Sequence, residues 1–217
     1  TIYDIAFVFD ADWRERMRAT DTGLTYIDHL THNVQRGNMA TWASFYERLF
    51  GFREVHYFDI EGKATGLVSK AMASPCGKIR IPLNESQDAD SQIEEFLKDY
   101  RGEGIQHIAL GSNDIYRTVD LLKAAGIALQ ETPDAYYVGV DVRIPGHGES
   151  IDALRARQIL IDGAPERGQG VLLQIFTRTV IGPIFFEIIQ RKGNEGFGEG
   201  NFRALFESIE RDQIRRG

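Results

Sequence analysis

The sequence predicts an α+β fold made of two β-α-β-β-β modules in tandem. Residues 27–30 (IDHL) match residues 105–108 (IQHI), and each of these strand-like segments has a histidine at its third position. The helices expected to follow them also end alike, with LFGF at 49–52 and AAGI at 124–127. Such self-similarity indicates that one supersecondary unit occurs twice. No stretch rich in Pro or Ser separates the two copies.

The first module is expected to begin with a strand at residues 25–34 and to continue with a helix at 39–52. Apolar residues recur at helical spacing in the second segment, and Gly51 is its expected C-cap. Ahead of this module, residues 2–9 are expected to form a strand and 11–23 a charged connecting segment. Three β-branched and aromatic runs with glycine-containing turns predict the strands 52–60, 65–74 and 77–84.

A short amphipathic helix at 91–102, with Ser91 as its N-cap, is expected to lead into the second module. That module is expected to begin with a strand at 104–112. A helix beginning at Ser112 or Asn113 follows it.

The rest of the second module contains one segment that the pattern leaves open. Residues 135–146 fit either a strand or irregular structure, and 150–162 predict a short helix. Two strands at 169–180 and 182–193, joined by a tight turn, are expected next. A glycine-rich loop then leads into an amphipathic helix from about Asn201.

Composition limits the classes of function. A chain of 217 residues with 42% hydrophobic content has enough apolar surface for a sizeable core. A net charge of −7 and the lack of a dense basic stretch argue against nucleic acid as a partner. No apolar run approaches the roughly 18 residues of a membrane span, so no membrane association is expected. The single cysteine, Cys76, excludes a disulfide framework and favours a cytoplasmic protein.

A metal site is predicted from His29, His107 and Glu187. Glu187 lies in the apolar run FFEII, and a buried carboxylate is costly unless a cation or a hydrogen-bond donor meets it. The two histidines occupy equivalent positions on the first strands of the modules, and Glu187 lies on the last strand of the second. Two histidines and one carboxylate are the ligand set of the facial triad that holds non-haem Fe(II). The donors also suit Mn(II) and similar ions, so spacing alone does not identify the metal.

The other histidines are expected to have structural or no roles. His32 is three residues from His29, and strand alternation places the two side chains on opposite faces. His56 lies in a half-exposed strand and His147 in a glycine-containing loop. The competing interpretation of Glu187 is a buried carboxylate paired with an arginine.

Segments throughout the chain resemble the catalytic part of the bacterial 4-hydroxyphenylpyruvate dioxygenase family. They are IDHLTHNV, TGLVSKAM, IRIPLNE, GEGIQHIAL, LLQIFT, FFEIIQRKG and GFGEGNFRALFESIERDQ, and they occur in the family's order. The family's N-terminal pair of modules has no counterpart here, and TIYDIAFVFD resembles its interdomain passage.

The resemblance implies a glyoxalase-like half-barrel, the vicinal oxygen chelate fold, around Fe(II). It divides the chain into an interdomain strand and connector at 1–23, a catalytic domain at 24–200 and a C-terminal helix at 201–217. The modules of the catalytic domain span about 24–88 and 103–192. The terminal helix and the glycine-rich loop before it fit a gate over the substrate or a cap on the barrel equally well.

The resemblance also implies a reaction. The family converts 4-hydroxyphenylpyruvate and O2 to homogentisate and CO2 in tyrosine and phenylalanine catabolism, and it commonly forms dimers or tetramers. By motif, its iron ligands fall on His29, His107 and Glu187. Its polar substrate-pocket positions fall on Ser69, Asn84, Gln92, Gln106 and Gln174, and its ring-enclosing aromatic positions fall on Phe176, Phe186, Phe197 and Phe202. Gln106 is the least secure of these, since on an ideal strand it points away from His107.

Three alternatives stay open. Hydroxymandelate synthase uses the same substrate and iron but hydroxylates the benzylic carbon, and phenylalanine at all four aromatic positions favours the dioxygenase over it. A metal-binding fragment that is inactive without an N-terminal domain is the second alternative. Extradiol cleavage of a catechol is the third, and the amide-rich pocket argues against it.

Overall fold

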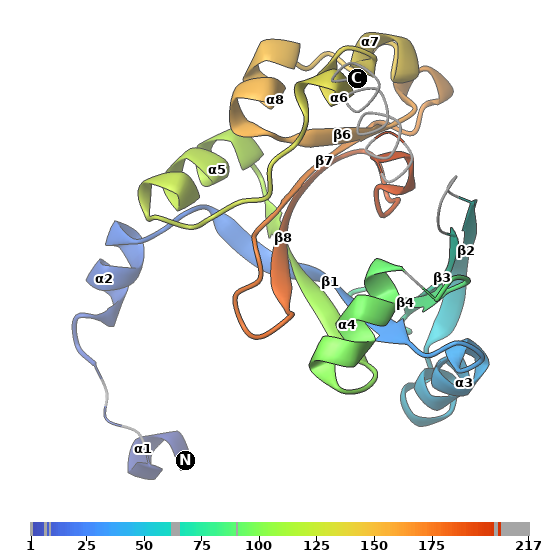
Figure 1. Ribbon diagram of the computed structural model, residues 1–217. Helices are drawn as coiled ribbons and strands as arrows, with labels where there is room; N and C mark the ends of the chain where they lie inside the picture. The colour runs from blue at the N-terminus through green and yellow to red at the C-terminus, as the bar shows by residue number, and fades with distance from the viewer. Residues whose placement is uncertain are drawn as a thin grey trace.

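The computed structural model describes residues 2–6, 8, 10–61, 66–89, 91–201 and 204. One curved eight-stranded β-sheet organises them, and it wraps around a concave face (Figure 1). The strands are β1 Leu24–Val34, β2 Arg53–Glu61, β3 Gly66–Ala73, β4 Arg80–Ser86, β5 Gly104–Ser112, β6 Leu160–Gly163, β7 Val171–Phe176 and β8 Phe185–Lys192. Their order in the sheet is β2-β3-β4-β1-β5-β8-β7-β6.

The strand order confirms the two tandem modules. The first strands of the modules, β1 and β5, pair antiparallel at the centre of the sheet. Each of them is flanked by the last strand of its own module, because β4 pairs parallel with β1 and β8 pairs parallel with β5. One half of the sheet therefore repeats the other with the strand order mirrored about the central pair.

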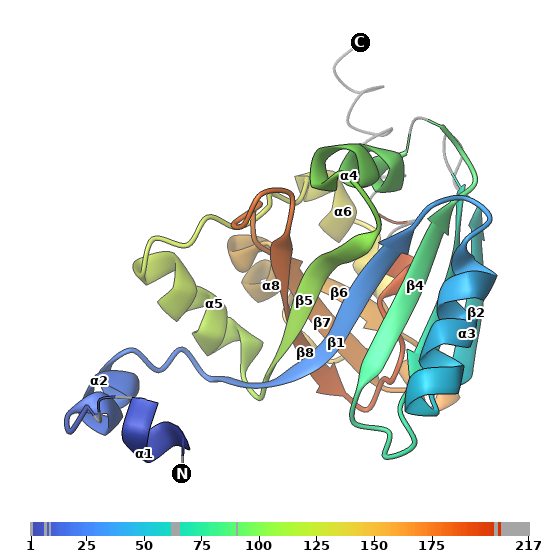
Figure 2. The same cartoon turned by 90° about the horizontal axis from the view of Figure 1, so that it is seen from below.

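Helices α3 and α5 lie outside the curve of the sheet, and α4 lies at one end of the strands (Figure 2). The helices are α1 Ile2–Ala6, α2 Trp13–Ala19, α3 Met39–Phe50, α4 Gln92–Tyr100, α5 Ile115–Ala124, α6 Asp134–Tyr137, α7 Val140–Arg143 and α8 Ile151–Arg157, with a 3-10 turn at Pro165–Arg167. Met39 and Ala43 of α3 pack in one core cluster, and Ile115 and Val119 of α5 pack in a second. Both cores lie on the convex side, and the concave face carries polar side chains together with a smaller apolar cluster of Ala109, Leu172 and Ile189.

The capping residues predicted for α3 and α4 are confirmed, and the predicted cap of α5 is displaced along the chain. Gly51 ends α3 in the left-handed conformation, with φ 67°. Ser91 caps α4 by accepting a hydrogen bond from the backbone N–H of Glu94 at 3.2 Å. The cap of α5 is Asp114, which accepts from the N–H of Arg117 at 3.1 Å, rather than Ser112 or Asn113.

The N-terminal prediction was wrong. Residues Ile2–Ala6 form helix α1 rather than a strand, and Ile2 and Ile5 are 69% and 88% exposed. None of the strands that the structure describes pairs with this segment, so local helical hydrogen bonds satisfy its backbone groups instead. The connecting segment contains a second exposed helix, α2. Both helices project away from the sheet (Figures 1 and 2).

Two segments of the second module also differ from expectation. Residues 150–162 are not one helix, since Gln158 takes a left-handed conformation with φ 64° and divides the segment into α8 and β6. Residues 135–146 contain the short helices α6 and α7, anchored by the buried Tyr136, which accepts a hydrogen bond from the N–H of Ile161 at 2.9 Å. Among the described residues, no helix has the length and apolar character needed to cross a membrane.

Candidate metal centre

Three adjacent strands bring His29, His107 and Glu187 together on the concave face. In the central register His29 lies opposite Ala109, and Ala109 lies opposite Glu187 on the next strand. Residues directly opposite each other share a face of the sheet. His107 lies two residues before Ala109 on β5, opposite Thr31 on β1, so its side chain shares this face. The predicted set therefore occupies one small patch on β1, β5 and β8.

The geometry of these side chains fits a cation. The Nε2 atoms of His29 and His107 both lie 3.3 Å from Oε2 of Glu187. One ligand atom from each of the three residues lies within 4.8 Å of the others, and all three residues are buried. Oε1 of Glu187 is buried without a hydrogen-bond partner among the described residues, and a bound ion would supply one. Two imidazole nitrogens and a carboxylate suit Fe(II) and related divalent ions.

Burial disfavours the charged forms of His29, His107 and Glu187, and the contacts among these residues determine the direction in which each pKa shifts. Burial tends to raise the pKa of Glu187, but the charges and hydrogen bonds of the two histidines outweigh it and lower this pKa to about 2. Burial tends to lower the pKa of His29, but Glu187 and Asp28 raise it to about 9. The pKa of His107 falls, because burial dominates and the charge of His29 repels a second proton. A metal ion binding here would displace the proton of His29.

A β-bulge orients each histidine. The register between β1 and β5 shifts at Asp28 and again at Gln106, where one strand carries an extra residue. Asp28 Oδ1 lies 2.8 Å from Nδ1 of His29, and Gln106 Oε1 lies 3.1 Å from Nδ1 of His107. Each contact holds Nε2 of the imidazole toward Glu187. The bulge also corrects the expectation that Gln106 points away from His107.

Asp28 was missed by the sequence reasoning. The repeat contains the signal that identifies it, because Asp28 and Gln106 occupy the equivalent position before the two aligned histidines. The family resemblance assigns Gln106 to the substrate pocket and assigns no role to Asp28.

The glycine-rich segment after β8 folds back over the centre. The ring of Phe197 lies 5.2 Å from the ring of His29 and 6.5 Å from that of Phe58. Gly198 packs so closely on Gln174 that a Cβ atom at this position would lie 2.7 Å from the amide carbon. The expected aromatic position 197 therefore lies beside the candidate metal ligands.

Two of the expected polar residues line the concave face of the first module. Ser69 on β3 lies opposite Asn84 on β4, and Asn84 lies opposite Asn33 on β1. Asn33 is two residues beyond Thr31 on the same strand, so this polar row shares the face of His29.

Gln174 and Phe176 line the same face in the second module. Phe176 lies opposite Glu187 in the register of β7 and β8, and its ring is 6.1 Å from that of His107. Gln174, two residues earlier, is 2% exposed and its Oε1 atom has no partner among the described residues.

The register corrects the expectation for Phe186. It lies opposite Ile108, whereas its neighbour Glu187 lies opposite Ala109, so the two side chains point to opposite faces. Phe185 takes the expected place, since its ring stacks on His107 at 4.9 Å and 22°. Alternation along FFEII contains this information, because the residue that shares a face with Glu187 is two positions away.

The remaining candidate site residues do not lie beside the metal centre in the described part of the chain. Gln92 is the first residue of α4 and is exposed. Phe202 falls outside the described residues. His32 lies on the convex face, 4.4 Å from the ring of Trp42 and with Nδ1 3.1 Å from the hydroxyl of Tyr46. Strand alternation had predicted this separation from His29.

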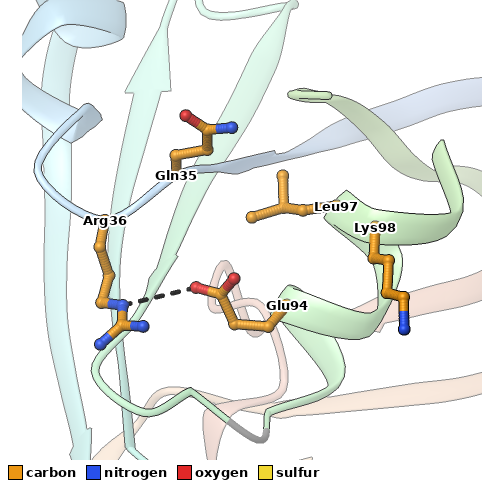
Figure 3. Close-up of a pocket in the computed structure, with 5 residues that line it drawn as sticks. All are labelled: Gln35, Arg36, Glu94, Leu97 and Lys98. Atoms are coloured by element: carbon orange, nitrogen blue, oxygen red, sulfur yellow. Dashed lines mark ion pairs between the residues drawn. The ribbon is translucent and has the colours of Figure 1, made fainter. Parts of the chain in front are cut away.

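A surface hollow of about 420 Å³ lies between the loop after β1 and helix α4 (Figure 3). The ion pair between Nε of Arg36 and Oε1 of Glu94, at 3.5 Å, spans it. Gln35, Leu97 and Lys98 complete the lining, and none of the three metal-ligand candidates contributes to it. We assign no role to this hollow.

Comparisons with known proteins agree with the geometry. A sequence model of the Glyoxalase/Bleomycin resistance protein/Dioxygenase superfamily matches residues 26–142. The chain is 66% identical to "Hemolysin VllY" of Vibrio vulnificus and 65% identical to "4-hydroxyphenylpyruvate dioxygenase" of Pseudomonas aeruginosa. Each alignment covers 100% of this chain and 60% of the relative, so the chain spans about three fifths of their length.

A solved structure supports the same fold. A mutant of 4-hydroxymandelate synthase from Streptomyces coelicolor superposes with a TM-score of 0.75 at 33% sequence identity. The superposition covers 88% of this chain and 55% of the synthase.

Proposed function

The chain belongs to the Glyoxalase/Bleomycin resistance protein/Dioxygenase superfamily, and on that basis we propose that it carries the metal centre of an Fe(II)-dependent 4-hydroxyphenylpyruvate dioxygenase. The reaction proposed is conversion of 4-hydroxyphenylpyruvate and O2 to homogentisate and CO2 in tyrosine catabolism. The convergence of His29, His107 and Glu187 on one buried patch carries the proposal. The 65% identity to the named Pseudomonas aeruginosa enzyme supports the choice of substrate.

In this proposal His29, His107 and Glu187 would hold the ion from one side, which would leave room for a 2-keto acid and O2 on the other. Fe(II) held this way supplies the capacity to activate O2 once the keto acid is bound. The protein fixes the orientation of both imidazoles, since Asp28 contacts Nδ1 of His29 and Gln106 contacts Nδ1 of His107.

The pocket around the centre would orient the substrate without adding charge. Ser69, Asn84 and Gln174 offer neutral donors and acceptors on the concave face. Phe176 and Phe197 lie beside the histidines and would exclude water from the reacting groups. Gln92 and Phe202 stay predictions from the family resemblance.

Hydroxymandelate synthase is the second candidate, because a member of that type is a structural neighbour at TM-score 0.75. Both reactions need the same metal centre and substrate, so the fold does not separate them. The higher identity to the named dioxygenase favours the first candidate.

We also propose that the protein acts in the cytoplasm as a homo-oligomer, a dimer or tetramer. The unpaired, exposed Cys76 fits a reducing compartment. The oligomeric state follows from the family resemblance alone, and sedimentation of the purified chain would test it.

A product assay tests the reaction. The chain is incubated with Fe(II), ascorbate, 4-hydroxyphenylpyruvate and air, and the products are separated by chromatography. We expect homogentisate from the wild type and from Glu166→Ala, an exposed carboxylate control, but none from Glu187→Ala. Hydroxymandelate would instead identify the synthase reaction.

Absence of product has two meanings that a second measurement separates. If Fe(II) and the keto acid still give a visible charge-transfer band under nitrogen, the centre is formed and the chain alone does not turn over. If neither product nor band appears, the metal centre itself is refuted.

A further inference from the structure

A buried ion pair lies directly behind the candidate ligand His29. Nε and Nη2 of Arg191 donate to Oδ2 and Oδ1 of Asp28, both at 2.8 Å. The side chain of Arg191 is 9% exposed and that of Asp28 is 3% exposed. Oδ1 of Asp28 also lies 2.8 Å from Nδ1 of His29. Burying such a pair is costly unless its hydrogen-bonding groups are satisfied, and here the carboxylate is shared between the arginine and the imidazole.

The other side of the guanidinium holds the loop that covers the centre. Nη1 of Arg191 donates to the backbone carbonyls of Asn194 at 3.0 Å and Gly196 at 2.6 Å. The guanidinium also lies 5.7 Å from the ring of Phe197, which itself lies against His29. The His29 imidazole therefore contacts Asp28 of the ion pair on one side and Phe197 of the loop on the other, and Arg191 contacts both Asp28 and the loop.

Among the residues that the structure describes, the second module shows no charged pair at the equivalent position. His107 is held by the neutral amide of Gln106 at 3.1 Å. Each histidine contacts the residue before it on its own strand, but the contact of His29 continues through the charged pair of Asp28 and Arg191 to the loop after β8. A pair that only stabilised the loop would not need to contact the imidazole.

We infer that Asp28 and Arg191 are positioning residues whose single ion pair fixes both the His29 imidazole and the loop at residues 193–198. The inference rests on the proposed function only in requiring a divalent metal at the centre. Because coupling between two events is reciprocal, metal binding tightens the loop and the closed loop tightens metal binding.

Cobalt binding and loop cleavage test this without catalytic turnover. Co(II) is titrated into the whole chain under nitrogen and followed by its visible absorption. In parallel, a glutamate-specific protease probes cleavage after Glu195, whose side chain is 66% exposed. The variants are Asp28→Asn, Arg191→Met and the double variant, and Asp120→Asn is the matched control. That control breaks a bidentate pair with Arg157 at 2.9 and 2.7 Å, which joins α5 to α8 and involves none of the strands that carry the candidate ligands.

We expect each single variant to lose about 10- to 100-fold in Co(II) affinity, the range typical for groups that orient metal ligands. The double variant should be no weaker than Asp28→Asn, because Arg191 acts through Asp28. Co(II) should slow loop cleavage in the wild type but not in Arg191→Met, while Asp120→Asn should behave as wild type in both assays.

Unchanged Co(II) affinity in the single variants, with faster loop cleavage, would overturn the inference and leave a pair that only fastens the loop. Additive losses in the double variant would overturn it as well. If Arg191→Met fails to fold, Arg191→Lys keeps the charge but not the bidentate geometry, and the same loss of affinity is expected. Failure of the wild type to bind Co(II) would instead refute the proposed metal centre and the inference with it.

Discussion

Replacing Gly198 by alanine is expected to open the loop over the metal centre. Gly198 has φ +79°, where a side chain costs about 1 kcal/mol. The new Cβ would lie 2.7 Å from the amide carbon of Gln174, which is 2% exposed and has little room to swing aside. Displacing a buried amide costs about 1–3 kcal/mol more. The sum, about 2–4 kcal/mol, corresponds at its lower end to a roughly 30-fold loss of affinity for a ligand that needs the closed loop.

Gly193 provides the matched control, because it has φ +87° but its added Cβ would meet nothing closer than 3.6 Å. Gly193→Ala should therefore show the conformational cost alone, about 1 kcal/mol or roughly fivefold in affinity. The assay titrates 4-hydroxyphenylpyruvate into the Fe(II)-loaded chain under nitrogen and follows the charge-transfer band. Equal losses in the two variants would refute the reasoning, since the overlap with Gln174 would then have been relieved without moving the loop.

Four further outcomes are expected. Glu187→Gln should lower Co(II) affinity by at least about 100-fold with the near-ultraviolet circular dichroism unchanged, since an anionic ligand is lost; retained affinity would exclude Glu187 as a ligand. Because the pKa of His29 is raised to about 9, Co(II) binding at pH 7 should release about one proton, measured by calorimetry in buffers of different ionisation enthalpy; no release would contradict this pKa. Burial lowers the pKa of His32 from 6.5 to about 4, so between these values the unfolded state binds a proton that the folded state excludes, and stability falls as the pH drops. Between pH 7 and 5 the wild type should lose roughly 2 kcal/mol more than His32→Gln in urea unfolding, and parallel losses would show that His32 titrates normally. Tyr136→Phe should cost about 1–3 kcal/mol in the same assay, because the hydroxyl contacts Ile161 and Asn201 in the core; a neutral effect would mean that these groups find other partners.

Much of the fold follows from local sequence signals. The duplicated strand with its histidine, the glycine at the end of α3 and the serine before α4 each act within a few residues, so they were readable without a structure. Two of the fold predictions failed, each for its own physical reason. The composition of residues 2–6 favours a strand, but a strand needs a neighbour, and no strand in the described part of the chain pairs with them. The left-handed Gln158 that separates α8 from β6 is a non-glycine residue at positive φ, which composition does not indicate.

The sequence alone determined that His29, His107 and Glu187 belong to one set, because the repeat aligns the histidines and a carboxylate in an apolar strand needs a partner. It could not determine which side chains surround them. The choice of Phe185 over Phe186 depends on the register of β5 and β8, and the turning of Asp28 and Gln106 toward the imidazoles depends on two bulges in the pairing of β1 and β5. The link from Asp28 to Arg191 joins residues 163 positions apart. Register, bulges and long-range ion pairs are properties of strands meeting one another, so only the tertiary structure could decide them.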